Sequence, residues 1–205
     1  MNETREKILD AAEFLFGQSG YAATSLRHII AEAGVNLAAI HYHFGSKQDL
    51  LDQVILRKVG KVNESRLRML EQFEAEAAPG TASVEKVLEA FIAPAILIEK
   101  SPEFIKLMGR VQTEGLMPDI ARRHFQPLMD RFFSAMRRAL PEMSQEELAW
   151  KSHFTLGAMA YTLTVRPAAR TEETSIAEIL KRLVSFLSGG FRAPAGVKKD
   201  IEVNR

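Results

Sequence analysis

The side chains best suited to chemistry lie close together between positions 36 and 47. This stretch offers an amide at Asn36, imidazoles at His41 and His43, a phenol at Tyr42 and an ammonium group at Lys47. Such groups donate hydrogen bonds to phosphate oxygens and base edges, and imidazoles also bind metal ions. A shared metal ion is excluded because residues i and i+2 of a helix point about 200° apart. The stretch therefore fits contacts with nucleic acid better than metal binding.

Several other kinds of chemistry are excluded by what the sequence lacks. It has no cysteine, which rules out disulfides, iron–sulfur clusters, thiolate zinc sites and a cysteine nucleophile. It also has no glycine-rich phosphate loop, no Gly-x-Ser-x-Gly and no His-Glu-x-x-His motif. We therefore expect no metal and no cofactor, and a small helical enzyme is the least favoured function.

The composition is that of an ordinary globular protein. Of 205 residues, 46% are hydrophobic and 26% are charged, and the net charge of +1 excludes a polybasic, histone-like binder. The N-terminus is charged, unlike a signal peptide, and the longest apolar stretch holds nine residues (90–98) with Pro94 inside it. A membrane span needs about 20 residues. We therefore expect a cytoplasmic protein with no membrane partner.

Apolar residues recur with a helical period along almost the whole chain, which predicts an all-α fold of about nine helices. Thr24 and Asn36 are expected to cap the second and third helices, and Ser144 and Ser175 to open two capping boxes. Pro127 must kink the seventh helix or mark a new start. The predicted helices span residues 4–16, 25–33, 37–43, 46–77, 83–100, 103–114, 119–140, 145–165 and 176–187.

Three short helices within the first 45 residues match a helix-turn-helix unit, with Gly34 in the turn between the second and third. In such a unit the second helix packs across the third and holds it outward, where it can enter a DNA major groove about 12 Å wide. Period and turn alone leave an ordinary helical hairpin inside a larger bundle as an alternative.

The residues of this region also carry a family resemblance. The run from Thr24 to Leu51, which includes His41-Tyr42-His43-Phe44-Gly45-Ser46-Lys47, closely resembles the DNA-binding signature of the TetR family of bacterial transcriptional regulators. Residues 8–12 and 16–21 extend the match to about fifty positions at fixed spacing. The resemblance implies a homodimer that binds a DNA operator with two-fold symmetry, and a ligand-controlled repressor more often than an activator.

Carried over position by position, the resemblance implies phosphate contacts from Tyr42 and Lys47, helped by Thr24. The other implied DNA-contacting positions face bases or backbone. Asn36, Leu37 and Ala38 replace residue types that are usual in the family, so no base preference can be transferred. The full predicted DNA-binding set is Thr24, Ser25, Asn36, Leu37, Ala38, Ala39, His41, Tyr42, His43 and Lys47.

The charge of this region is unusual for a DNA-binding domain. Residues 1–50 hold four positive and six negative side chains, a net charge of −2. Domains that bind DNA by charge alone are strongly basic. We therefore expect contacts through helix N-termini, hydroxyls and a few cations, and a shallow salt dependence.

We predict a DNA-binding domain over residues 1–46, an effector-binding and dimerisation domain over 47–192 and a polar tail over 193–205. The helices from Trp150 and Ile176 are apolar over wide arcs, so each must be covered on two sides, by the domain's own interior and by a partner subunit. A larger single-chain core is the alternative. The predicted dimer residues are Leu156, Met159, Leu163, Ile179, Leu183 and Phe186.

Phenylalanine and methionine are numerous in the C-terminal part and suit a pocket for a small apolar effector, with a dry packed core as the alternative. Candidates for holding an acidic headgroup are Arg110, Arg122, Arg123, His124 and His153. The predicted ligand-binding residues are Phe91, Phe104, Leu107, Met108, Val111, Phe125, Met129, Phe132, His153, Phe154 and Gly157.

Residues 150–158 and 186–192 also resemble, more loosely, the fatty-acid- and acyl-thioester-responsive branch of the family. This resemblance implies a long-chain acyl effector. We expect ligand binding to tilt the helix 46–77, move the two recognition helices apart and release DNA. A constitutive helix-turn-helix protein without effector is the alternative function.

Overall fold

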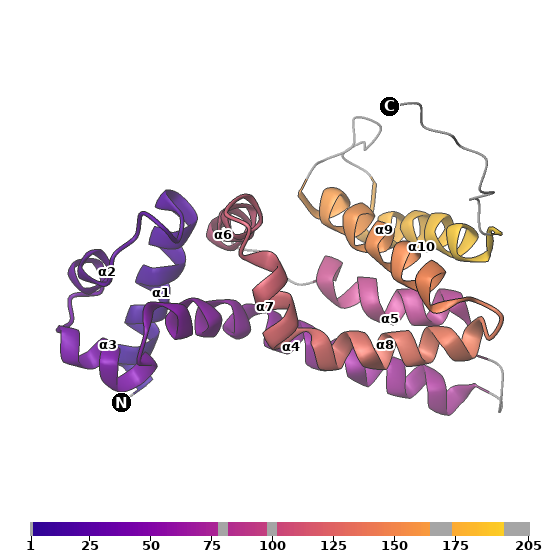
Figure 1. The fold of residues 1–205 in the computed structure, drawn as a ribbon, viewed down its shortest axis with the longest axis horizontal. Helices are drawn as coiled ribbons and strands as arrows, with labels where there is room; N and C mark the ends of the chain where they lie inside the picture. Colours follow the sequence, from indigo (N-terminus) through magenta and orange to yellow (C-terminus); the bar gives the residue numbers. More distant parts are fainter. Residues whose placement is uncertain (1, 78–81, 98–101, 165–173, 195–205) are drawn as a thin grey trace. The chain divides into compact units, whose positions relative to one another are not determined.

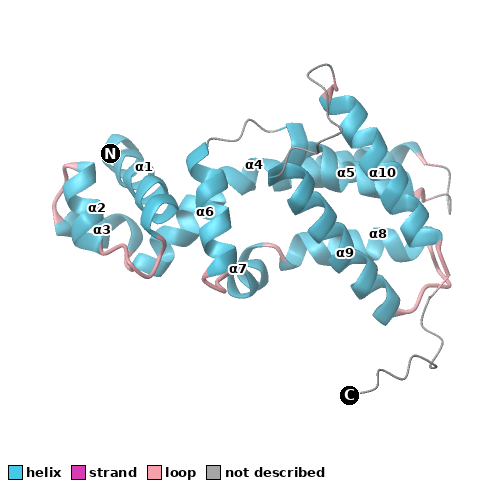
Figure 2. Ribbon diagram, turned by 90° about the horizontal axis from the view of Figure 1, so that it is seen from above, coloured by secondary structure: helices cyan, strands magenta, loops and turns pink. Residues whose placement is uncertain are grey.

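The computed structural model describes residues 2–77, 82–97, 102–164 and 174–194, which form ten α-helices and, within these ranges, no strand (Figure 1 and Figure 2). The predicted all-α fold class is confirmed. None of the described helices is long and apolar enough to cross a membrane. The helices are α1 (Asn2–Ser19), α2 (Leu26–Ala33), α3 (Leu37–Phe44), α4 (Lys47–Glu76), α5 (Val84–Leu97), α6 (Pro102–Thr113), α7 (Met117–His124), α8 (Gln126–Ala139), α9 (Gln145–Thr164) and α10 (Ile176–Arg192).

The additional helix arises where Pro127 was expected to kink a helix or begin a new one. Helix α7 ends at His124 with Phe125 as its C-cap, and α8 begins at Gln126. Pro127 therefore lies in the first turn of α8, where a missing N–H removes no helical hydrogen bond. The proline marks a new start, and the predicted segment 119–140 is two helices.

The local signals for helix starts are largely confirmed. Asn36 accepts a hydrogen bond from the backbone N–H of Ala39 at 2.9 Å. The hydroxyls of Ser144 and Ser175 each accept one from the backbone N–H three residues later, both at 3.1 Å. Each of these bonds satisfies one of the free donors at a helix N-terminus.

The chain divides into two compact units, which we call unit 1 (residues 1–64 with 98–129) and unit 2 (residues 65–97 with 130–205). Helices α4 and α8 contribute residues to both. The predicted domain boundary at residue 46 does not coincide with the division between these two units, and the assignment of functions to the two sides of residue 46 remains a prediction.

Unit 1 has one apolar core, to which α1, α2, α3, α4, α6 and α7 all contribute. Burying each of these large side chains stabilises the fold by about 1.5–3 kcal/mol. Ile29 of α2 and Ile40 of α3 are fully buried in this core. The opposite faces of both helices are exposed, so each helix is anchored by one face. The largest fully buried side chains of the core are Ile8, Leu9, Phe16, Ile29, Ile40, Leu50, Leu51, Ile55, Leu107 and Ile120.

In unit 2, α10 packs on α5 and on α9. Leu183, Leu187 and Phe191 of α10 are buried, as is most of α5. The rings of Phe91 on α5 and Phe132 on α8 meet edge to face with centroids 4.7 Å apart. Aromatic pairs in this arrangement add about 0.5–1.5 kcal/mol beyond their buried area.

Helix α9 turns a different face inward from the one predicted. Phe154 was predicted to bind the ligand and Met159 to lie against a partner subunit, but Phe154 is 60% exposed and Met159 is half-buried on the face of α9 that also buries Leu148. The buried face also contains Thr155, whose hydroxyl donates to the carbonyl of Lys151 at 2.8 Å. This hydrogen bond lowers the free-energy cost of burying a hydroxyl group. The apolar pattern of the sequence did not indicate that Thr155 would be buried.

Candidate nucleic-acid interface

The turn between α2 and α3 has the backbone geometry that a helix-turn-helix unit requires. Helix α2 begins at the N-cap Ser25, whose hydroxyl accepts from the backbone N–H of His28 at 3.2 Å, and the His28 ring accepts in return from the Ser25 N–H. The helix ends at Gly34, which has a φ of 65°. This left-handed conformation favours glycine and redirects the chain into α3.

Thr24 does not cap α2, because the N-cap is Ser25. The Thr24 side chain is buried, and its hydroxyl lies 2.7 Å from the carbonyl oxygen of Gly20 and 3.2 Å from that of Leu15. The hydroxyl closes the turn between α1 and α2 and is turned away from solvent. Of the two adjacent hydroxyl residues, the more accessible one is Ser25, which remains in the proposed DNA-binding set.

Helix α3 presents one face outward and buries the other. Ile40 is fully buried and Phe44 nearly so, whereas Leu37 is 50% exposed and Tyr42 is 73% exposed. Ala38 and His41 are exposed as well. The remaining two predicted positions on the helix, Ala39 and His43, are half-buried at its edge.

Two side chains on α3 have part of their hydrogen-bonding capacity in use. The Oδ1 atom of Asn36 accepts from the Ala39 N–H, which leaves one lone pair of that oxygen and the Nδ2 donors for a contact with a base. The Nδ1 atom of His41 lies 3.0 Å from the carbonyl oxygen of Gly45. A carbonyl only accepts, so Nδ1 carries the proton and the neutral ring offers an acceptor at Nε2.

Lys47 lies at the start of α4, where its ammonium group sits 4.2 Å from the ring centroid of Tyr21. Partial burial lowers the pKa of Lys47, and the negative charge of Glu114 opposes that effect. The cation is therefore held close to the α1–α2 turn. Tyr21 and Glu114 thus position the ammonium group of Lys47, which is the group expected to contact a phosphate.

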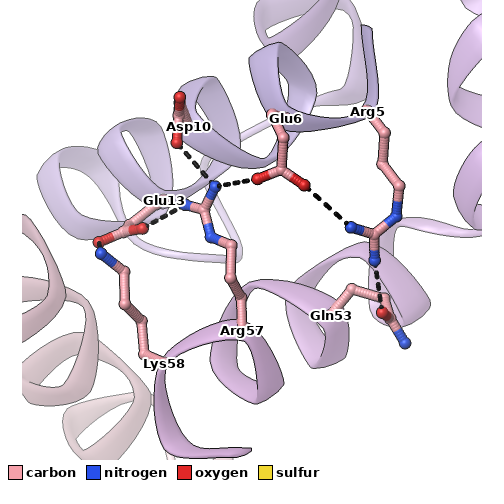
Figure 3. A network of polar contacts seen from close by, with 7 residues as sticks. All are labelled: Arg5, Glu6, Asp10, Glu13, Gln53, Arg57 and Lys58. Atoms are coloured by element: carbon pink, nitrogen blue, oxygen red, sulfur yellow. Dashed lines mark hydrogen bonds and ion pairs between the residues drawn. The ribbon is translucent and has the colours of Figure 1, made fainter. Parts of the chain in front are cut away.

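A polar network between α1 and α4 contains three of the six acidic side chains in the first 50 residues (Figure 3). Arg57 of α4 donates to Glu6 at 3.2 Å, Asp10 at 2.7 Å and Glu13 at 2.5 Å. Lys58 lies 3.3 Å from the second oxygen of Glu13. Two cations that follow residue 50, Arg57 and Lys58, thus offset part of the negative charge of α1, and the charge count of the first 50 residues did not include them.

Most of the predicted headgroup-binding cations are engaged with other protein groups. Arg123 donates twice to Asp52 at 3.0 Å, and the Nε2 atom of His124 lies 3.2 Å from the same carboxylate. Arg110 donates to the carbonyl oxygen of Gln18 at 3.1 Å. Arg122 pairs with Asp119 on the surface at 2.8 Å, and His153 is exposed on α9.

Burial acts to raise the pKa of Asp52, but hydrogen bonds from Arg123 and Gln48 and the nearby His124 ring outweigh it and hold that pKa below its ordinary value. These bonds connect α7 to the first turns of α4. Arg123 and His124 therefore position helices within unit 1, and their contacts give no indication of a ligand.

Sequence analysis missed a buried cation in unit 2, Arg66. Its side chain is 5% exposed, it donates to the carbonyl oxygen of Phe91 at 2.8 Å, and its guanidinium carbon lies 4.3 Å from the Phe91 ring centroid. Its Nη2 atom is 3.8 Å from the sulfur of Met159. Burial lowers the pKa of Arg66 to about 10. Its sequence context, between exposed charged residues of a long helix, gave no signal of burial.

The predicted ligand-binding residues are divided between the two units. Leu107 and Val111 belong to the core of unit 1, and Phe104 and Phe125 pack against it. Met108 and Met129 are half-buried in the same unit. In unit 2, Phe91 and Phe132 are buried, whereas His153, Phe154 and Gly157 lie exposed on α9.

The predicted dimer residues are also mixed in exposure. Phe186 is 73% exposed and Leu156 39% exposed, but Leu183 faces the core of unit 2. Ile179 is half-buried, and the side chain of Leu163 lies outside the described residues. The exposed large apolar side chains of α9 and α10 are Trp150, Phe154, Leu156, Tyr161, Ile176 and Phe186.

Among the described residues no three histidine or acidic side chains gather in a way that could hold a metal ion.

Two family models match the chain. The model described as "Bacterial regulatory proteins, tetR family" matches residues 8–54, which hold α2, α3 and the turn between them. The model described as "Tetracyclin repressor-like, C-terminal domain" matches residues 89–190. Together the two matches cover most of the chain.

Two curated relatives agree with these matches. The HTH-type transcriptional regulator AcrR of Shigella flexneri is 38% identical over 74 residues, 36% of this chain and 34% of that protein. The dual regulator CecR of the same organism is 30% identical over 128 residues, 61% of this chain and 53% of that protein. The matches thus span between a third and about half of these relatives.

The crystal structure of a TetR-family transcriptional regulator from Bordetella parapertussis shares the fold. Its TM-score is 0.61 at 16% identity, and the match covers 89% of this chain and 93% of that one.

Proposed function

Because the chain belongs to the TetR family of bacterial transcriptional regulators, whose members are not enzymes, we propose that it is a repressor that binds a DNA operator as a homodimer. In this proposal α3 enters the major groove of each half-site. The bases face Asn36, Leu37, Ala38 and His41, and Tyr42 contacts phosphate.

The observation that supports this proposal most directly is the orientation of α3. Its apolar residues Ile40 and Phe44 are buried in the core of unit 1, while Leu37, His41 and Tyr42 are exposed. The exposed Leu37 and Tyr42 side chains contribute little to the packing of a single chain. They suit a helix that covers base edges and phosphates.

Dimerisation is proposed through the exposed faces of α9 and α10. Trp150 and Phe154 stack with ring centroids 5.9 Å apart, and both remain more than half exposed in the single chain. Phe186 of α10 is exposed in the same unit. Exposed aromatic side chains of this kind are typical of an interaction site. In the dimer the two recognition helices would lie about 34–36 Å apart, one turn of DNA.

The effector is proposed to be a small apolar molecule bound in unit 2. Phe91 and Phe132 are buried there edge to face, and Arg66 lies over the ring of Phe91, so a cation adjoins an aromatic cluster. This combination suits a ligand with an apolar body and an acidic group, and a long-chain acyl compound is the version we propose. Because α4 carries both Arg66 and Lys47, a tilt of this helix would change how the DNA-contacting helices are presented.

Two measurements test the proposal. The purified chain is used to select duplexes from a randomised DNA library, and native mass spectrometry reports its oligomeric state and any retained small molecule. A two-fold symmetric selected sequence and a dimer are expected. A monomer, or no enriched sequence, would overturn the repressor model.

The effector part is tested separately by gel shift of the selected duplex with a long-chain fatty acid such as palmitate. We expect palmitate to release the duplex at saturation. If it does not, the acyl version is wrong. If the dimer also retains no small molecule, the constitutive DNA-binding alternative is favoured.

A further inference from the structure

The turn between α1 and α2 depends on a carboxylate from a distant part of the chain. Glu114, which directly follows α6, accepts a hydrogen bond from the backbone N–H of Tyr21 with one oxygen and from that of Ala22 with the other, both at 3.0 Å. Backbone N–H groups in a tight turn need partners, and bonds to a charged acceptor are about twice as strong as neutral ones.

The backbone of the turn is shaped to admit this carboxylate. Gly20 has a φ of 85°, and a Cβ atom at this position would lie 2.0 Å from the Oε1 atom of Glu114. Any side chain at position 20 would therefore be strained by its backbone and would also displace the carboxylate. The hydroxyl of Thr24 binds the carbonyl oxygen of Gly20, so both polar sides of the turn are satisfied.

Helix α6 holds the end of α1 at two further points. Arg110 donates to the carbonyl oxygen of Gln18 in the last turn of α1, where a cation is favourable. Gly17 allows a close approach, since a Cβ atom there would lie 3.0 Å from the carbonyl oxygen of Glu103. The two helices lie side by side in both views (Figure 1 and Figure 2).

The contact between Glu114 and the α1–α2 turn lies close to two proposed DNA-contacting residues. Ser25, the N-cap of α2, comes three residues after Ala22, and Lys47 lies over the ring of Tyr21. The negative charge of Glu114 also acts on Lys47. Displacing the carboxylate would therefore disturb both the start of α2 and a proposed phosphate contact.

We propose that Glu114 is a positioning residue for DNA recognition, which fixes the α1–α2 turn and through it the start of α2 and the ammonium group of Lys47. The inference rests on the proposed function. It assigns to an acidic residue outside the helix-turn-helix unit a contribution to operator affinity.

The sign of the effect separates positioning from simple electrostatics. If only charge mattered, neutralising an acid in a DNA-binding unit would strengthen binding to DNA. Positioning requires the opposite. We expect Glu114→Gln and Glu114→Ala to weaken binding of the library-selected duplex by at least about tenfold, a change of about 1.4 kcal/mol. The control Glu64→Gln, which removes an exposed charge from α4 in the same unit, should change affinity by less than about twofold.

Hydrogen exchange provides a readout that does not involve DNA. In the free protein the amides of Tyr21 and Ala22 should exchange at least about tenfold faster in Glu114→Gln than in the wild type, with the core amides of α1 unchanged. Gly20→Ala should weaken duplex binding in the wild-type background and cost less in the Glu114→Ala background, because the two changes disturb one contact.

The outcomes distinguish this inference from the proposed function. A wild-type chain that selects no duplex overturns both. A wild-type chain that binds its duplex while Glu114→Gln binds equally well or more tightly overturns only the role of Glu114. If Glu114→Ala does not fold, Glu114→Gln carries the test, because its amide oxygen retains the shape and one acceptor.

Discussion

Arg57 is the residue whose loss should most clearly show how α1 is held against α4. We consider Arg57→Met, which keeps most of the aliphatic stem and removes the guanidinium. In unit 1 this group donates to Glu6, Asp10 and Glu13 (Figure 3). Burial acts to lower the pKa of Arg57, but the hydrogen bonds that it donates to the three carboxylates outweigh burial and raise that pKa.

The three pairs differ in how much each should contribute. The side chains of Asp10 and Glu6 are 72% and 44% exposed, so each pair is worth about 0–1 kcal/mol. The Glu13 side chain is 6% exposed, and breaking a buried pair costs about 3–5 kcal/mol because a charge is left behind. Lys58, 3.3 Å from Glu13, remains in the variant and offsets part of this cost. We therefore expect Arg57→Met to destabilise the fold by about 2–4 kcal/mol.

Urea unfolding at pH 7, followed by circular dichroism, measures this change. The matched control is Arg122→Met, since Arg122 is 75% exposed and pairs only with Asp119 in its own helix turn; it should cost less than about 0.5 kcal/mol. In the double variant Arg57→Met/Glu13→Gln the buried charge is gone, so much of the stability should return. Equal effects of Arg57→Met and Arg122→Met, or a double variant no more stable than the single one, would refute the reasoning.

The remaining predictions concern pH, salt and the recognition helix. The hydrogen bond from Arg192 lowers the pKa of Glu85 to about 2, so this pair's stabilisation is present above the ordinary value of 4.5 and lost as pH falls toward 2. Acid titration of stability in Glu85→Gln should therefore be shallower than in the wild type, and a superimposable titration would contradict this. The logarithm of operator affinity should fall with log salt much less steeply than ~10 phosphate contacts would require; filter binding at several salt concentrations checks the slope. Tyr42→Ala should weaken duplex binding without lowering the melting temperature, whereas Ile40→Ala, which empties a fully buried site, should destabilise by about 2–5 kcal/mol. A stable Ile40→Ala variant would show that α3 is not anchored by this residue.

What the sequence could predict was local. The caps at Asn36, Ser144 and Ser175 were predictable because cap and partner lie three residues apart. The cap at Ser25 was misassigned to Thr24, since both hydroxyls fit the pattern. Only the tertiary contacts of the α1–α2 turn decide which of the two is buried.

Contacts between distant residues left no such signal. Glu114 binds backbone N–H groups 93 and 92 positions away, and any acidic residue could have done so. The buried face of α9 was missed for a related reason. Apolar residues surround that helix, so its period does not select a face, and the choice is made by packing against its neighbours, such as Met159 beside Arg66.

The charge of the DNA-contacting region shows how these long-range contacts alter a conclusion drawn from sequence. A net charge of −2 over residues 1–50 argues against DNA binding if every charge is free to act on the phosphates. In the structure Glu6, Asp10 and Glu13 pair with three cations, Arg5, Arg57 and Lys58, between α1 and α4. Opposed charges held a few ångströms apart produce a much weaker field at a distance than either charge alone. The acidic side chains of α1 therefore repel phosphates near α3 less than the charge count implied, and we expect affinity to rest on hydrogen bonds and helix termini.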